Sequence, residues 1–111
     1  MELADSIGHA DNPLKWDAAH NLLRVLFDTQ RYDEAAELGR EVLAARRRIL
    51  PPGHVGTLAT LRGCIESLLK QSQVTECETI IREMSESGEL PESERAELIE
   101  LIDASKPPIG M

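Results

Sequence analysis

The 111-residue sequence has few aromatic residues, only two cysteines and no long apolar run. Aromatic residues make up 3% of the chain, so its core must be built from aliphatic side chains, which suits packed helices. Two cysteines are too few for the disulfide framework of a small secreted domain. No segment approaches the ~20 apolar residues of a transmembrane helix, and the polar N-terminus does not resemble a secretory signal. We therefore expect a cytoplasmic protein.

Positive charge is also scarce, and it is unevenly distributed. The net charge is −8. Residues 1–73 contain ten acidic and nine basic residues, whereas residues 74–111 contain ten acidic and three basic residues. A negative field of this kind repels phosphate backbones and anionic membrane surfaces. The composition therefore argues against nucleic acid and membrane partners.

The most informative pattern is an internal repeat with a spacing of 42 residues. Residues 21–26 align with residues 63–68, and residues 32–38 align with residues 74–80. In both copies the apolar residues have the spacing of a helix followed by a turn and a second helix. A fixed period of this length is typical of a solenoid, in which each unit buries its apolar face by stacking on its neighbours.

Local signals divide the chain into five predicted helices. Asn12-Pro13 provides an N-cap followed by proline at the first helical position, and the helix ends near residues 28–30. The second helix spans about residues 33–49 and ends at Pro51-Pro52-Gly53. The third spans about residues 55–71, and the fourth about residues 74–87, where Gly88 stops it.

The fifth predicted helix lies after Pro91 and fits the third helix at an offset of 34 residues. Glutamates cover its remaining faces, as expected for a helix at the end of a solenoid. The predicted fold is thus all-α: a short superhelix of two helix–turn–helix repeats plus a C-terminal capping helix. Its parts are a tail (1–11), a helical domain (12–105) with repeat one (12–50), repeat two (54–88) and the capping helix (91–103), and a second tail (106–111).

Three segments have distinctive motifs: residues 30–35 are Gln-Arg-Tyr-Asp-Glu-Ala, residues 46–54 join three arginines to Pro51-Pro52-Gly53 and His54, and Thr57-Leu58 follows. These segments resemble the tetratricopeptide repeat, in the 42-residue variety found in kinesin light chains. The first resembles the turn and the start of a second repeat helix, the second the basic helix end, proline-bearing link and histidine between repeats, and the third the start of the next unit. The sequence departs from the family at Gln30 and Ser72, where the turn commonly has glycine. It also departs at the usual small residue of the first helix, here Leu23 and Ile65, which predicts a wider helix pair.

The resemblance implies that the first helix of each repeat lines a concave groove that holds a peptide. Asn21 keeps the asparagine that often contacts a peptide backbone in this family, and Gly63 replaces it in the second repeat. Arginines nearby can bind a carboxylate. The candidate partner-binding residues carried over by position are Asp17, His20, Asn21, Arg24 and Asp28 from the first repeat, and Arg62, Glu66, Leu69 and Lys70 from the second.

Other chemistry has little support in the sequence. Cys64 and Cys77 with His20 and His54 lack the close ligand pairs of a zinc site, and both cysteines fall on apolar repeat positions. Arg46-Arg47-Arg48 lies in the last turn of a helix, where cations are stabilised by the helix dipole. No nucleophile motif or glycine-rich phosphate loop is present. We therefore predict no catalytic, metal or cofactor site.

The leading hypothesis is a non-enzymatic module that binds a protein or peptide partner. An alternative is self-association into a homodimer through the first helix, because no preceding repeat covers its apolar edge unless Leu3, Ile7 and Leu14 do so. Another alternative is a regulatory subunit or fragment of a larger enzyme or receptor complex. The identity of the partner does not follow from the sequence.

Overall fold

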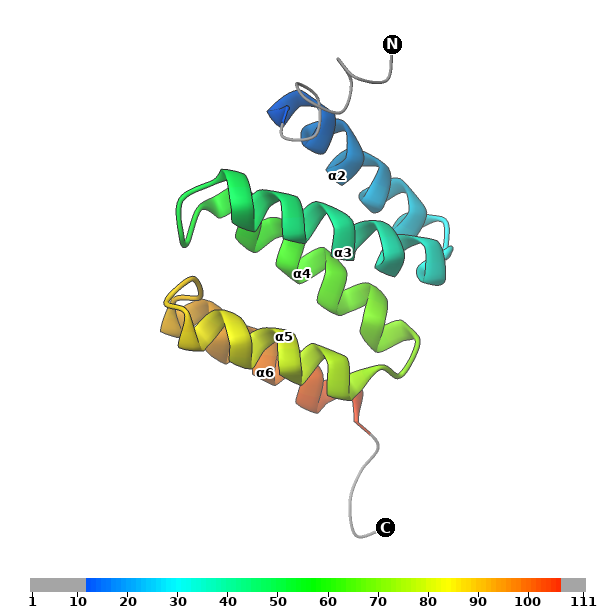
Figure 1. The fold of residues 1–111 in the computed structure, drawn as a ribbon. Helices are drawn as coiled ribbons and strands as arrows, with labels where there is room; N and C mark the ends of the chain where they lie inside the picture. Colours follow the sequence, from blue (N-terminus) through cyan, green and yellow to red (C-terminus); the bar gives the residue numbers. More distant parts are fainter. Residues whose placement is uncertain (1–11, 107–111) are drawn as a thin grey trace, which may run out of the picture.

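The computed structural model describes residues 12–106 and contains, in this range, helices without any strand. The helices are α2 (Pro13–Asp28), α3 (Tyr32–Ile49), α4 (Val55–Lys70), α5 (Val74–Glu86) and α6 (Glu92–Ser105). They form a stack with α2 at one end and the pair α5 and α6 at the other (Figure 1). The predicted all-α helical stack is confirmed, and each boundary lies within two residues of its predicted position. The predicted tail over residues 1–11 lies outside the described residues, as do residues 107–111 of the second predicted tail.

Two helices begin at side-chain caps that the sequence supplies. Asn12 Oδ1 accepts a hydrogen bond of 2.9 Å from the backbone N–H of Leu14, with Pro13 at the first helical position. His54 plays the same part at the start of α4, because its Nδ1 accepts a hydrogen bond of 2.9 Å from the Gly56 N–H. The histidine of the link between repeats is therefore a helix cap.

Three helices end in the same backbone motif, although only one of them has glycine there. The residues after the caps, Gln30, Ser72 and Gly88, all have positive φ angles of 66°, 62° and 83°. In each turn the next residue donates a backbone hydrogen bond across the helix end, as Arg31 does to Leu26 O at 2.8 Å. This is the Schellman motif, in which glycine is favoured because it has no Cβ. The first two turns thus keep the geometry expected of the family without its glycine.

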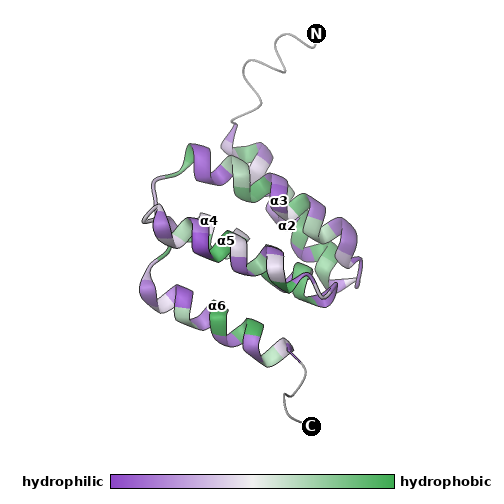
Figure 2. Ribbon diagram, turned by 60° about the horizontal axis from the view of Figure 1, so that its bottom comes forward, coloured by the Kyte–Doolittle hydropathy of each residue, from purple (hydrophilic) through white to green (hydrophobic). Residues whose placement is uncertain are grey.

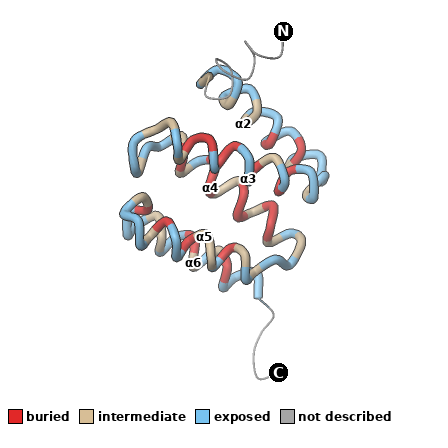
Figure 3. Tube along the Cα trace, viewed as in Figure 1, coloured by how far each residue is buried: buried red, intermediate tan, exposed pale blue. Residues whose placement is uncertain are grey.

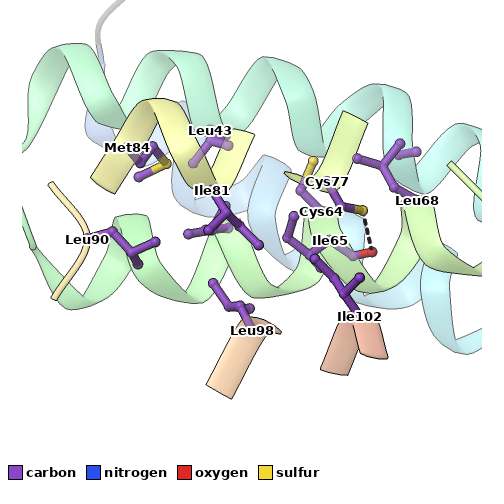
Figure 4. Close-up of a cluster of buried hydrophobic side chains, with 12 residues drawn as sticks. Leu43, Cys64, Ile65, Leu68, Cys77, Ile81, Met84, Leu90, Leu98 and Ile102 are labelled. Atoms are coloured by element: carbon purple, nitrogen blue, oxygen red, sulfur yellow. Dashed lines mark hydrogen bonds between the residues drawn. The ribbon is translucent and has the colours of Figure 1, made fainter. Parts of the chain in front are cut away.

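The apolar core consists of a large and a small cluster. The large cluster joins α3, α4, α5 and α6 (Figure 4) and contains Ala36, Leu43, Leu61, Cys64, Ile65, Leu68, Cys77, Ile81, Met84, Leu90, Leu98 and Ile102. The small cluster joins α2 to α3 and contains Leu23, Leu26 and Ala35. Buried residues are frequent along α4, and the first turns of α2 have none (Figure 3). Both aliphatic clusters agree with the low aromatic content.

Helix spacing differs along the stack. A Cβ added to Gly39 of α3 would lie 3.2 Å from Cys64 Cβ and 3.3 Å from Cys64 Cα, so α3 and α4 are in close backbone contact there. The backbones of α4 and α5 approach each other over a shorter stretch than those of α2 and α3. Leu23 and Ile65 are both fully buried. Because the closer pair, α2 and α3, also has a bulky residue at the usual small position, that residue does not by itself determine the helix spacing.

Helix α6 has apolar side chains on more than one face, unlike a helix that only caps the core. Leu98 and Ile102 are buried in the large cluster. Ile99 and Leu101 are half-buried and line different hollows on the surface. Figure 2 shows apolar and hydrophilic residues alternating along α6, as along the other helices. The helix therefore closes the core and also contributes apolar side chains to two surfaces.

Candidate functional site

Two adjoining hollows cross the first helix of each repeat. The first hollow has a volume of about 410 Å³ and is lined by His20, Arg24, Phe27, Asp28, Ala59, Arg62, Gly63 and Glu66. The second has a volume of about 580 Å³ and is lined by Phe27, Glu66, Leu69, Lys70, Leu101, Ala104 and Ser105. Because Phe27 and Glu66 line both, the two hollows adjoin each other over α2, α4 and α6. We call this surface the groove.

Most of the predicted binding residues line the groove. His20, Arg24, Asp28 and Arg62 line the first hollow, Leu69 and Lys70 line the second, and Glu66 lines both. Their shared placement follows from the helical spacing within α2 and α4, which puts these positions on one face of each helix.

The two remaining candidates lie elsewhere. Asn21 is exposed and lines neither hollow. Asp17 lines a small hollow beside Trp16 and Ile49, and its carboxylate accepts a hydrogen bond of 2.7 Å from Arg46. Asp17 thus has a structural partner within the chain.

The charged residues of the groove differ in how far they are already paired. Arg62 forms ion pairs with Glu97 and Glu94 of α6, and the nitrogen of Lys70 lies 5.7 Å from the centre of the Tyr32 ring. Arg24 has no hydrogen bond or ion pair among residues 12–106. Arg24 is therefore the cation in the groove that is most available to a ligand.

A buried polar network includes His20, which lines the first hollow. The Arg46 guanidinium is buried and donates to Gly56 O at 2.9 Å, to Thr60 Oγ1 at 3.0 Å and to Asp17 Oδ1 at 2.7 Å. Thr60 Oγ1 also lies 3.1 Å from Nδ1 of His20. Burial and the nearby cations Arg46 and Arg24 lower the pKa of His20, so its ring is held neutral in the fold. This network ties α2, α3 and α4 together beneath the groove.

Sequence reasoning missed three features of this site. Phe27 follows Arg24 and His20 at three and seven residues, so helical periodicity could have found it. The 34-residue offset aligns Ala104 with Lys70, which could have extended the groove onto α6. The role of Arg46 depends on contacts with two other helices, so the residues next to it in the sequence do not predict it.

The cysteines and histidines do not come together in one site. Both thiols are buried, and this desolvation raises the pKa of Cys64 to about 12 and that of Cys77 to about 11. Cys77 Sγ lies 3.7 Å from Ile65 O, which makes it a packed core group. No group of three or more metal-binding side chains comes together within residues 12–106.

Comparison with known proteins identifies the repeat. The sequence model of the tetratricopeptide repeat family matches residues 17–56, which cover most of α2, all of α3 and the start of α4. No curated protein and no solved structure matches the chain. Repeats of this family are non-enzymatic modules that mediate protein–protein interactions. In the described part of the chain, no helix is both long and apolar enough to cross a membrane. The family match shows that residues 17–56 are similar to a tetratricopeptide repeat, and the five-helix stack is consistent with a short helical array of this type.

Proposed function

We propose that this protein is an interaction module that binds a peptide segment of a partner protein in the groove. The observation that carries the proposal is the pair of adjoining hollows along α2, α4 and α6. Of these, α2 and α4 are the first helices of the two repeats, and in the family the first helix of each repeat lines the concave face. A surface made of successive first helices can hold an extended segment along its length.

The lining of the groove indicates what such a peptide contains. The second hollow has an apolar floor of Phe27, Leu69 and Leu101. Arg24 in the first hollow is without an internal partner among the described residues, so it can bind a carboxylate in bidentate fashion. We therefore propose a peptide that combines an apolar side chain with an acidic group. Burial of the apolar side chain provides affinity, and the charge pair orients the peptide.

A comparison of variants in a capture experiment tests the proposal. The tagged full chain is incubated with extract, and quantitative mass spectrometry compares partners captured by wild type, Arg24→Glu and Leu69→Ser. Glu41→Lys serves as control, because Glu41 is an exposed residue of α3 that lines neither hollow of the groove. A groove-dependent partner should fall about tenfold or more with both groove variants and stay unchanged with the control. Equal capture by all variants, with helicity preserved by circular dichroism, would remove the groove from the function.

A second function, homodimerisation, is supported by the outer face of α2. Leu14, Leu22 and Val25 are 75%, 49% and 54% exposed, and Ala18 is exposed between them. Their spacing places all four on one face of the helix, where a preceding repeat would pack in a longer array. The predicted covering by Leu3 and Ile7 falls on residues outside those described. A symmetric dimer would bury this apolar face.

Light scattering coupled to size-exclusion chromatography, over a range of protein concentrations, tests the dimer. Leu22→Glu places a charge at the centre of the α2 face and should shift the mass to that of a monomer. Val55→Glu is the matched control, since Val55 is 76% exposed at the start of α4. A wild-type chain that is monomeric at every concentration would exclude this function.

A further inference from the structure

The outer face of α2 concentrates the apolar exposure of the described residues. Three of the four large apolar side chains that are exposed within residues 12–106 lie on it, namely Leu14, Leu22 and Val25. Ala18 is exposed between them, and its small side chain leaves room for a side chain from another helix. Figure 1 shows α2 at one end of the stack. This face therefore has the apolar surface and the relief of a helix-packing site.

Charged residues line one edge of this face. Asp17, Arg24 and Asp28 are exposed and recur at spacings of seven and four residues, so they lie along the same side of α2. Arg24 and Asp28 form no ion pair within residues 12–106. The Asp17 side chain is still 62% exposed, although one of its oxygens accepts a hydrogen bond from Arg46. Both an acid and a base along this edge are therefore accessible to a partner.

The order of these charges fits a second copy of α2 that runs antiparallel. A two-fold axis between antiparallel helices brings the same edge of each helix together. Asp17 and Arg24 are equally far from the midpoint between residues 20 and 21, so an axis there places each beside the other residue of the second copy. The same register places Ala18 beside Leu22 of the second copy. One axis thus gives two ion pairs and sets a small residue against a large one.

The ends of α2 favour the same orientation. Its first turn has no acidic residue and its last turn has no basic residue, so neither end of its dipole is compensated within the helix. In an antiparallel pair, Asp28 of the second copy lies near the N-terminus of α2, and Lys15 of the second copy lies near its C-terminus. In a parallel pair, the edge with Asp17 and Arg24 faces the opposite edge of the second copy, where Lys15 is the charged residue of α2. Arg24 then gains no acid.

We propose that the outer face of α2 docks onto the same face of a second copy of this chain, antiparallel, with two Asp17–Arg24 ion pairs between the copies. This arrangement rests on the proposed homodimer and adds its orientation and its charge determinants. Apolar contacts provide the affinity, and the ion pairs select the register. Because Arg24 also lines the first hollow, it can bind either the second copy or an acidic segment in the groove. The two therefore compete for this side chain.

Charge reversal tests the ion pairs. Asp17→Arg and Arg24→Asp each place like charges opposite each other in a homodimer, so the dissociation constant from sedimentation equilibrium should rise about tenfold or more. A mixture of the two variants restores both pairs, and a heterodimer of near wild-type affinity should form. Arg82→Asp, at an exposed arginine of α5, is the control and should leave the association unchanged. A mixture that associates no better than either variant alone would overturn the ion pairs.

Engineered cysteines test the orientation independently of charge. Leu14 and Val25 are about 16 Å apart along α2, and the antiparallel register brings Leu14 of one copy near Val25 of the other. Mixed Leu14→Cys and Val25→Cys chains should therefore form a disulfide-linked heterodimer with diamide as oxidant, whereas neither variant should cross-link with itself. Non-reducing electrophoresis measures the products. Wild type is the control, because Cys64 and Cys77 are buried. If Asp17→Arg loses helicity through its contact with Arg46, these cross-links decide.

The outcomes separate this arrangement from the homodimer itself. Cross-linking of each cysteine variant with itself, but not with the other, would indicate a parallel dimer and overturn the orientation alone. Dimerisation of wild type without any of these cross-links would place the contact outside α2. A wild-type chain that stays monomeric would overturn both the homodimer and its arrangement. If Leu3→Glu combined with Ile7→Glu then makes that chain dimeric, its own N-terminal segment is the occupant of the face.

Discussion

The two junctions of this short stack join similar helices by different means. Where α2, α3 and α4 meet, the helices are linked by the polar network of Arg46 and by the close approach of Gly39 to Cys64. Where α4, α5 and α6 meet, large aliphatic side chains fill the space, and ion pairs from Arg40 and Arg47 of α3 to Glu76 and Glu89 lie at its rim. The family match covers the first junction and stops at the start of α4. A repeat can thus keep its helical architecture after its packing chemistry has changed.

The largest effect should come from a cavity in the second junction. Leu98 is fully buried among α4, α5 and α6, so Leu98→Ala removes packed atoms that its neighbours cannot replace. We expect a loss of about 3 kcal/mol in the free energy of unfolding, measured by urea denaturation. Leu101→Ala, at a half-buried position of the same helix, should cost about 1 kcal/mol. Equal losses would mean that α6 is not integrated into the core.

The first junction should be destabilised by the loss of one polar side chain, that of Arg46. Arg46→Ala leaves Thr60 Oγ1 and Gly56 O without this donor and opens a gap between three helices. We expect a loss of about 2 kcal/mol. Arg82→Ala, at an exposed arginine, is the control and should change stability by less than ~0.5 kcal/mol. A neutral result for Arg46→Ala would show that packing alone holds this junction.

These two junctions also show which structural features can be predicted from the sequence. Helix boundaries followed from local signals, such as Asn12-Pro13 and Gly88, because caps and turns depend on neighbouring residues. The candidate positions on α2 and α4 were carried over from the family resemblance, and all except Asp17 and Asn21 line the groove. The network of Asp17, Arg46 and Thr60 did not, because its members are far apart in the chain and meet only after three helices have packed.

Contributions from α6 to the groove were missed for a related reason. The pattern of α6 predicted a buried side and a charged exterior, but not which half-buried residue would face which surface. Leu101 faces the groove and Ile99 faces the recess between α5 and α6 only because α6 is oriented by Leu98 and Ile102 in the core. Tertiary packing determines this rotation, and periodicity alone leaves it open.

The helix-end turns allow a stabilising change in each junction. Gln30 and Ser72 have the left-handed φ angles that glycine adopts without steric cost. Gln30→Gly and Ser72→Gly should each stabilise the protein by up to ~1 kcal/mol, although part of the gain is offset by the flexibility of glycine in the unfolded chain. Gly88→Ala should destabilise it by a similar amount. Thermal denaturation of the three variants measures this, and destabilisation by both glycine substitutions would contradict it.

Acidification should weaken the first junction before the second. The pKa of His20 is lowered by burial and by Arg46 and Arg24, with Asp17 opposing them. Below its ordinary pKa of about 6.5, the unfolded chain therefore binds a proton that the folded chain resists, and stability falls as pH drops through that range. The pKa values of Glu76 and Glu89 are lowered by hydrogen bonds from Arg40 and Arg47, so their contribution is lost only at lower pH, below about 4.5.

Urea denaturation at pH 7.5 and 5.5 separates these two contributions. His20→Gln should lose less stability than wild type between the two pH values, because glutamine does not titrate. The stability of the His20→Gln chain at pH 7.5 provides the reference for any packing change. An unchanged pH dependence would show that His20 does not couple protonation to folding.

The smallest effect should come from the rim of the second junction, where exposure decides the worth of an ion pair. Arg40 and Glu76 are 2.6 Å apart, but their side chains are 45% and 33% exposed. Water and salt screen such a pair, so Arg40→Ala should cost only about 0.5 kcal/mol at low salt and less at high salt. Arg47 and Glu89 are 31% and 14% exposed and should be more strongly coupled. Double-mutant cycles at both pairs measure the difference. A larger coupling for Arg40–Glu76 would mean that burial does not rank these pairs, and that the rim contributes to stability by another route.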